Sequence, residues 1–169
     1  MAVIAADIKF FLSGGAANSD ANASLGGVKS SVEITDATLH NLFDVVSSAE
    51  ASAGDVEYRC LYVENTNATD TLLTALAWIS SNTPSGDTAL AIGLGSAAID
   101  ATEQTVANES AAPAAVTFSA PATQGAGLAI GNLAAGEHKA IWLRRTISAG
   151  AAAYNNDTAT INVGGDTGA

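Results

Sequence analysis

Short runs in which apolar residues recur at every second position constrain the fold of this chain more than any other feature. The clearest run covers residues 55–65, where Tyr58, Cys60 and Tyr62 alternate with a second, semi-apolar set that includes Leu61. Related runs occur along the rest of the chain, at 8–12, 29–35, 71–80, 88–95, 115–121, 137–147 and 158–163. A period of two residues is typical of β-strands, because successive side chains point to opposite faces. The pattern therefore predicts about eight strands.

The segments between these runs are mostly short and are rich in Gly, Asn, Asp, Ser and Pro, which favour turns. Apolar residues at helical spacing occur in one place, residues 36–55, where the stretch from Leu39 to Val46 could form a helical turn. Strands that follow one another without long helices between them indicate an antiparallel sandwich or barrel. We therefore predict an all-β fold, a single-domain antiparallel β-sandwich of jelly-roll or immunoglobulin-like type over residues 1–169.

Residues 13–31 form a tract of small and polar residues directly after the first predicted strand. The tract lacks the charge density and the proline of a disordered tether, and apolar strands flank it. Its small side chains allow another backbone to approach closely. We predict an ordered loop or arm that lies over a neighbouring protein, with Ser13, Gly14 and Gly15 among its contact residues.

The charge of the chain is strongly negative, since seventeen Asp and Glu residues against six Lys and Arg give a formal net charge of −11. Proteins that bind nucleic acid need a positive field around the phosphate backbone, so nucleic acid is not an expected partner. The start of the chain lacks the basic and apolar regions of a secretory signal, and no apolar run reaches the length of a membrane span. We therefore expect a soluble protein that is made in the cytoplasm and has no membrane partner.

Residue types that support catalysis are few. The single cysteine, Cys60, excludes an internal disulfide and a cysteine-based zinc site, and its place in an alternating run predicts a buried, unreactive thiol. The two histidines, His40 and His138, share no motif with an acid or a nucleophile, and no serine lies in a nucleophile elbow. We therefore predict that the chain is not an enzyme.

Two stretches match a ligand-binding motif in part. Asn18, Asp20 and Asn22 are spaced like the first ligands of a calcium-binding EF-hand loop, but other residues occupy the later Gly and Glu positions. Gly93 and Gly95 are spaced like the phosphate-binding turn of a dinucleotide fold, but neither a helical pattern nor a ribose-binding acid follows. We favour an Asn- and Asp-rich surface loop for the first stretch and an antiparallel strand for the second. The sequence thus predicts neither a metal nor an organic cofactor.

The strand predicted at 137–147 holds three of the six cationic residues, Lys139, Arg144 and Arg145, beside Trp142. By the strand period, Trp142 and Arg144 share one face, and Lys139 and Arg145 share the other. One interpretation is that the arginines neutralise acids on neighbouring strands of the same protein. The other is that Trp142 and Arg144 anchor an interface, since both residue types are enriched at binding hot spots. Both interpretations stay open, and all four residues are predicted interface residues.

The most recognisable phrases of the chain lie in its turns and strands. They include LSGGAANSDANASLGG, DVEYRCLYVENTN, SSNTPSGDTALAIGLG and IWLRRTISAGAAAYNNDTATINVGGDT. These phrases resemble a family of virion structural proteins of tailed bacteriophages, in which small β-rich members look like capsid decoration or cement proteins. The resemblance implies that the major capsid protein is the partner, that many identical copies are present, and that no cofactor is bound. We also predict self-association as a trimer or dimer, because linked weak contacts raise the effective concentration of each site. It also implies a location in the virion, after assembly in the host cytoplasm.

Two alternative functions stay open. A tail, collar or baseplate component of the same kind of virion would be compatible with the same sequence features. A carbohydrate-binding or adhesin domain would need a row of exposed aromatic side chains to stack on sugar rings. Here Trp78, Trp142 and the three tyrosines lie mostly in alternating strands, so this alternative is the more distant one.

Overall fold

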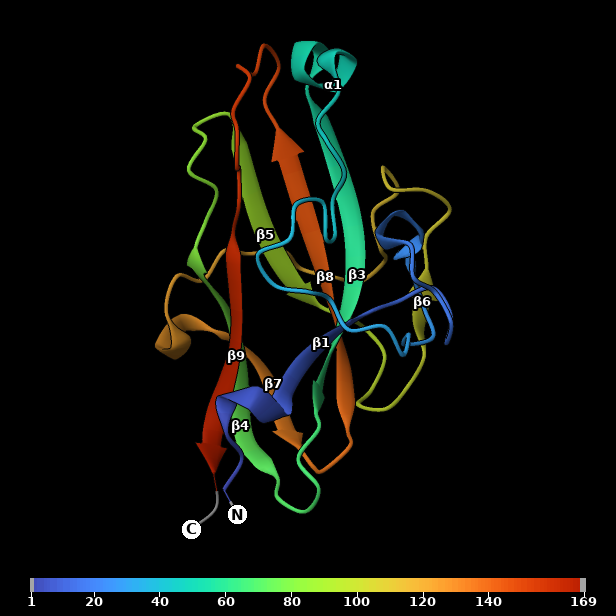
Figure 1. Ribbon diagram of the computed structural model, residues 1–169, viewed down its shortest axis with the longest axis vertical. Helices are drawn as coiled ribbons and strands as arrows, with labels where there is room; N and C mark the ends of the chain where they lie inside the picture. The colour runs from blue at the N-terminus through green and yellow to red at the C-terminus, as the bar shows by residue number, and fades with distance from the viewer. Residues whose placement is uncertain (1, 168–169) are drawn as a thin grey trace.

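The structure of the chain, a computed structural model, describes residues 2–167 and consists mainly of β-strands (Figure 1). In chain order the nine strands of this part are β1 (Ile8–Leu12), β2 (Gly26–Gly27), β3 (Asp55–Asn65), β4 (Leu72–Ser81), β5 (Thr88–Leu94), β6 (Glu103–Thr105), β7 (Leu128–Leu133), β8 (His138–Ile147) and β9 (Thr160–Thr167). Its helical elements are the α-helix α1 (Ser48–Ala53) and three 3-10 helices, η1 (Ala5–Asp7), η2 (Ala21–Ala23) and η3 (Gln124–Ala126). None of these helices is long and apolar enough to cross a membrane. The predicted all-β fold is confirmed.

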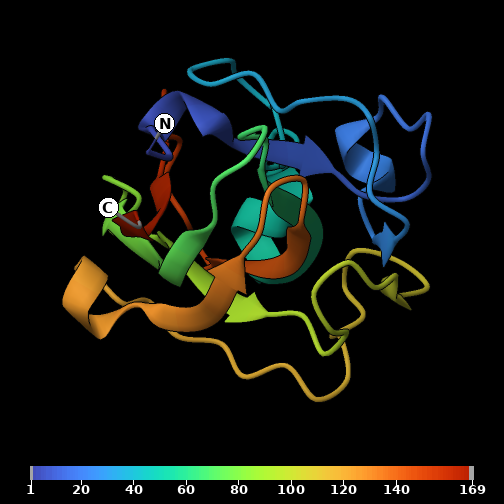
Figure 2. The ribbon, with the colours of Figure 1, turned by 90° about the horizontal axis from the view of Figure 1, so that it is seen from below.

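The strands form three antiparallel sheets, of which the largest has the order β1-β3-β8-β5. Its central ladder, between β3 and β8, runs from Asp55 opposite Ile147 to Glu64 opposite His138. A second sheet has the order β7-β4-β9, and a third consists of the short strands β2 and β6. Figure 2 shows the three-stranded sheet and the β2–β6 pair on opposite sides of the four-stranded sheet. The architecture is therefore a β-sandwich with an additional cover on one outer face.

The main apolar core fills the space between the four-stranded and the three-stranded sheet. Leu61 and Val63 of β3 and Ile141 and Leu143 of β8 belong to it, as the strand period predicts. The facing strand β4 contributes small residues such as Ala75. Each large aliphatic side chain that is fully buried stabilises the fold by about 1.5–3 kcal/mol, so this core holds the two sheets together.

The outer face of the four-stranded sheet is also buried, under a second apolar cluster. Cys60 and Tyr62 of β3 and Trp142 of β8 form its centre. The cover consists of the arm at 13–31 and of the segment at 103–118, which contributes a valine, an alanine and a phenylalanine to the cluster's edge. In the middle of β3, from Cys60 to Val63, both faces are covered, and the residues on both faces are apolar there.

The arm folds back onto its own chain. The backbone N–H of Cys60 donates a hydrogen bond to Ser24 O at 2.8 Å, and Ser13 Oγ donates one to Cys60 O at 2.8 Å. These bonds pair the arm with the edge of β3 just beyond the point where β1 ends. Buried backbone groups on an open sheet edge need partners, so the arm completes the sheet that it covers. The predicted arm is thus ordered, and one of its sides covers its own sheet.

The strand pattern differs from the prediction at the sheet edges. Residues 29–35 meet β1, and residues 115–121 meet β5, at one isolated bridge each. Both stretches run along an outer strand, where no second neighbour holds them in register. β7 was not predicted, because Gly131, at a φ of 98°, and Asn132 interrupt its apolar alternation. β2 and β6 are too short for a period to be visible.

The helix α1 begins later than the apolar spacing predicted. Ala37 and His40 have positive φ values of 56° and 58°, which interrupt a helix in the preceding segment. The helix starts instead at a capping box, in which Ser47 Oγ accepts a hydrogen bond from Glu50 N at 3.3 Å and Glu50 Oε2 accepts one from Ser47 N at 2.6 Å. Local hydrogen bonding therefore overrides apolar spacing in this segment.

We expect Trp142→Ala to lower the free energy of unfolding by about 3–5 kcal/mol, because it removes a fully buried aromatic side chain. Urea denaturation followed by circular dichroism measures this value. Tyr154→Ala is the matched control, since 54% of Tyr154 is exposed and its loss should cost no more than about 0.5 kcal/mol. Equal losses of unfolding free energy for the two substitutions would contradict the burial of Trp142 in the second cluster.

Candidate functional site

Two of the predicted interface residues, Trp142 and Ser13, lie inside the protein, and both are 0% exposed. Ser13 Oγ donates to the carbonyl of Cys60 and accepts a hydrogen bond from Gly26 N at 3.1 Å, so its hydroxyl joins the arm to the sheet. Gly26 lies so close to Trp142 that a Cβ there would be 3.0 Å from its ring. The prediction that these residues contact a partner is wrong, because the arm closes over them.

Arg145 neutralises acids of its own chain. It lies directly opposite Glu57 in the β3–β8 ladder, and its Nε donates to Glu57 Oε2. Its Nη1 donates to the backbone carbonyl of Asp44 at 2.8 Å, and its guanidinium lies over the ring of Phe43, 4.8 Å from the centroid. Only 13% of its side chain is exposed. For Arg145 the structure therefore supports neutralisation across strands rather than an exposed interface residue.

Arg144 and Lys139 are half-buried and also point to partners within the chain. The guanidinium of Arg144 lies 5.3 Å from the centroid of the Phe118 ring. Lys139 Nζ donates to the carbonyl of Ala97. Burial lowers the pKa of Lys139, although the nearby Glu103 carboxylate opposes this effect. The basic strand is therefore not a free cationic patch.

A buried charge network extends from Arg145 to the opposite edge of β3. Arg59 is fully buried, and its Nη2 lies 2.5 Å from Glu109 Oε2 and 3.2 Å from Asn22 Oδ1. Burial raises the pKa of Glu57, and the hydrogen bond from Arg145 works in the opposite direction. Sequence reasoning missed this network, because its members lie up to 101 residues apart and no local pattern connects them.

Two groups of carboxylates in the described residues have metal-binding spacing, with oxygens within 4.8 Å of one another. One group is Asp44, Glu57 and Glu109, and the other is Glu50, Asp55 and Glu57. Two arginines already contact the first group. The sequence analysis predicted no metal. The acids of the second group lie close together in the sequence, and this proximity is a signal that could have identified them as a cluster.

His138 forms a pair with Asp100 that the sequence did not reveal. Its Nδ1 lies 3.0 Å from Asp100 Oδ1, and its backbone N–H donates to the same oxygen at 2.9 Å. Burial lowers the pKa of His138, and Asp100 works in the opposite direction. In residues 2–167 no serine, threonine or cysteine side chain donates a hydrogen bond to this imidazole. The pair fixes the orientation of the ring but lacks the nucleophile of a catalytic triad.

Tyr62 joins the cover to the sheet. Its hydroxyl donates a hydrogen bond to Gly27 O at 2.6 Å and accepts one from Glu103 N at 3.0 Å, so it contacts both β2 and β6. Burial raises the pKa of Tyr62 to about 12. Burial also raises the pKa of the neighbouring Cys60 thiol. These two side chains are structural, as was predicted for Cys60.

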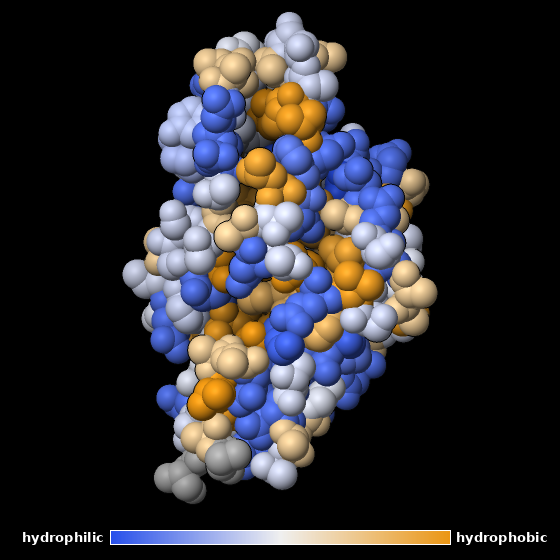
Figure 3. Space-filling model, viewed as in Figure 1, coloured by the Kyte–Doolittle hydropathy of each residue, from blue (hydrophilic) through white to orange (hydrophobic). Residues whose placement is uncertain are grey.

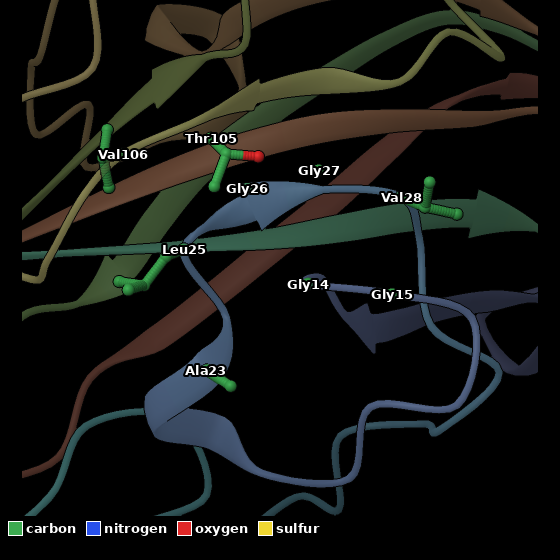
Figure 4. A pocket seen from close by; sticks show the side chains of 9 residues that line it. All are labelled: Gly14, Gly15, Ala23, Leu25, Gly26, Gly27, Val28, Thr105 and Val106. Atoms are coloured by element: carbon green, nitrogen blue, oxygen red, sulfur yellow. The ribbon is translucent and has the colours of Figure 1, made fainter.

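The predicted contact residues Gly14 and Gly15 line a hollow of about 370 Å³ between the arm and β6 (Figure 4). The complete lining is Gly14, Gly15, Ala23, Leu25, Gly26, Gly27, Val28, Thr105 and Val106. A Cβ on Gly26 would lie 1.8 Å from Gln104 O, so glycine is required for the close contact between arm and β6. The lining has no charged residue and consists largely of backbone and small side chains. It suits a small apolar group of a partner and offers no catalytic chemistry.

The two partial motifs have structural roles. Asn18 Oδ1 accepts a hydrogen bond from Asp20 N, and Asp20 Oδ1 accepts one from Asn22 N, as in an Asn- and Asp-rich surface loop. Gly93 lies inside β5, where a Cβ would be 2.5 Å from a side-chain atom of Val116 in the cover. The glycines of the second motif therefore make room for the cover.

Exposed apolar side chains do not gather into one docking patch on the face shown in Figure 3, where hydrophilic residues interrupt the apolar areas. The large exposed apolar residues of the described chain are Ile4, Val28, Leu39, Val45 and Tyr154. Of these, Val28 lies at the hollow. The hollow is therefore the candidate contact site that combines a concave shape with an exposed apolar residue.

No protein-family model matches this chain, and neither the curated proteins nor the solved structures contain a match to it. The function is therefore inferred from the geometry described above together with the resemblance of the sequence. Neither source identifies a substrate or a reaction.

We expect Tyr62→Phe to lower the free energy of unfolding by about 1–3 kcal/mol, because it leaves Gly27 O and Glu103 N without their buried partner. Urea denaturation measures the change. Tyr154→Phe is the control, and we expect no measurable change for this exposed tyrosine. An unchanged free energy of unfolding for Tyr62→Phe would show that the hydroxyl does not stabilise the contact between the cover and the sheet.

We expect Cys60 to resist a thiol reagent such as DTNB in the folded protein, because burial blocks access and keeps the thiol protonated. The absorbance of the released product measures the reaction. Complete labelling in denaturant shows that the thiol itself is intact. Rapid labelling without denaturant would mean that the arm opens readily.

Proposed function

We propose that this chain is a structural virion protein of a tailed phage that binds the capsid surface and stabilises the shell, as a decoration or cement protein. The resemblance of its turn and strand phrases to such proteins supports this function. The observation that supports it best in the structure is the uncharged hollow, whose backbone walls suit a partner protein better than a substrate. The candidate ligand of the hollow is a small apolar side chain of the major capsid protein.

The electrostatics are compatible with an outer position on the shell. A net charge of −11 repels nucleic acid and disfavours a position next to packaged DNA. Most cationic side chains form ion pairs within the chain, so they do not reduce the repulsion between the protein surface and nucleic acid. An outward-facing acidic protein would avoid the DNA and remain soluble before attachment.

Attachment through many copies would need only modest affinity at each hollow. We propose self-association as a dimer or trimer on the shell, because linked contacts raise the effective concentration of each site. The protein would then reach the virion after synthesis and assembly in the host cytoplasm.

Mass spectrometry of purified virions tests the function directly. A copy number close to that of the major capsid protein is the expected result. A few copies per particle would instead assign the chain to the tail, collar or baseplate, and absence from the particle would reject a virion role.

We expect Val28→Arg to weaken binding to expanded empty shells by about 2 kcal/mol or more, the scale of a binding hot spot, because it places a charge at the hollow. Val28 is 48% exposed, so stability should change by no more than about 0.5 kcal/mol. Sedimentation with shells measures occupancy. Val45→Arg, at an exposed valine outside the hollow, is the control and should bind normally. Equal binding of both variants would remove the hollow from the interface.

A further inference from the structure

Three carboxylates meet where α1 joins β3, at the end of the molecule that Figure 1 places at the top. Glu50 lies in the first turn of α1, and Asp55 and Glu57 lie on the same face of β3. One oxygen from each carboxylate lies within 4.8 Å of the other two. Gly54, at a φ of 78°, forms the tight link between the helix and the strand. The acids are therefore held by two regular elements rather than by a loose loop.

Each of the three carboxylates has one oxygen engaged and one free. Glu50 Oε2 accepts a hydrogen bond from the helix cap at 2.6 Å, and Asp55 Oδ1 accepts one from the next backbone N–H at 2.7 Å. Glu57 Oε2 accepts from Arg145. Among the described residues, no donor reaches Glu50 Oε1, Asp55 Oδ2 or Glu57 Oε1. Three carboxylate oxygens are thus available for a ligand.

Glu57 provides the observation that distinguishes this group from an ordinary acidic surface. The residue is 0% exposed, and its Oε1 is buried without a hydrogen-bond partner in the described chain. A buried charged oxygen without a donor or a cation is strongly unfavourable, since it has lost its hydration. Water cannot reach this atom in the way that it hydrates exposed acids. Arg145 compensates the charge of this carboxylate through Oε2 alone, so Oε1 is the oxygen left for a ligand from outside the chain.

The charge balance favours the α1 side of Glu57 for such a partner. On the other side, Asp44 and Glu109 already contact Arg145 and Arg59. On the α1 side, Glu50 and Asp55 form no ion pair with a described residue, and Arg145, which pairs with Glu57, is shared with Asp44. The excess charge at the helix–strand junction is negative.

We propose that Glu50, Asp55 and Glu57 bind a divalent cation, and that Ca²⁺ fits this site best. Ca²⁺ binds carboxylate oxygens at about 2.3–2.6 Å, so oxygens on opposite sides of the ion are up to about 5 Å apart. Mg²⁺ demands a stricter octahedron at about 2.0–2.1 Å and is usually bound by one or two carboxylates, so a group of three carboxylates suits Ca²⁺ better. Water molecules complete the coordination. The bound ion joins α1 to the end of the β3–β8 ladder, and this role does not depend on the function proposed above.

Thermal unfolding and isothermal titration calorimetry with CaCl₂ test the site on the full chain, after EDTA treatment and at constant ionic strength. We expect saturable heat with a stoichiometry of one. At about 100 times the Kd, Ca²⁺ should raise the Tm by roughly 5–10 °C. No heat and no shift in Tm would overturn the proposal.

Asp55→Asn and Glu50→Gln locate the ion, because each removes one free charge and retains the shape of the side chain. We expect each to weaken Ca²⁺ binding at least tenfold. Asp166→Asn is the matched control. Asp166 lies near the C-terminal end of β9 and belongs to neither carboxylate group, so this variant should bind Ca²⁺ normally. If all three variants keep the full Ca²⁺ response, the effect is general screening of the negative charge, and the proposed site is wrong.

Discussion

The β3–β8 ladder is the interaction on which the rest of the structure depends. One of its faces packs against the three-stranded sheet, and the other is buried under the arm and the segment around β6. A ladder buried on both faces needs partners for every polar group along it. The Ser13 hydroxyl of the arm donates to Cys60 O of β3, and the Tyr62 hydroxyl of β3 donates to Gly27 O of the arm. This requirement explains why the small, polar arm is ordered.

The same ladder organises the charges. The chain has few cations, and the ladder places Arg145 directly opposite the buried Glu57, while Arg59 reaches Glu109 around the edge of β3. Removing one member of a buried pair leaves the other charge uncompensated, which is costly. The network is thus a structural constraint, and it explains why Arg145 pairs with acids of its own chain. Its acids exceed its cations, and this excess is the basis of the proposed Ca²⁺ site.

Periodicity located the long strands well, because alternation is a local property of the chain. The run at 71–80 is shifted by one residue from β4, and the run at 137–147 starts one residue before β8. Short strands such as β2, and β7 with its interrupting Gly131, left no such signal. The period also assigned Trp142 and Arg144 to one face. It could not reveal that this face is covered, because both faces of the sheet are apolar.

By itself, the sequence determined the all-β class, the low helix content and the negative charge, since alternation, turn residues and composition act over a few neighbours. Only the tertiary structure decided that the arm covers its own sheet, that Trp142 is core, and that Glu57 pairs with Arg145. These outcomes depend on contacts between segments that are far apart in the chain. Such contacts form when strands close into sheets, and no local pattern specifies which segment will cover an apolar face.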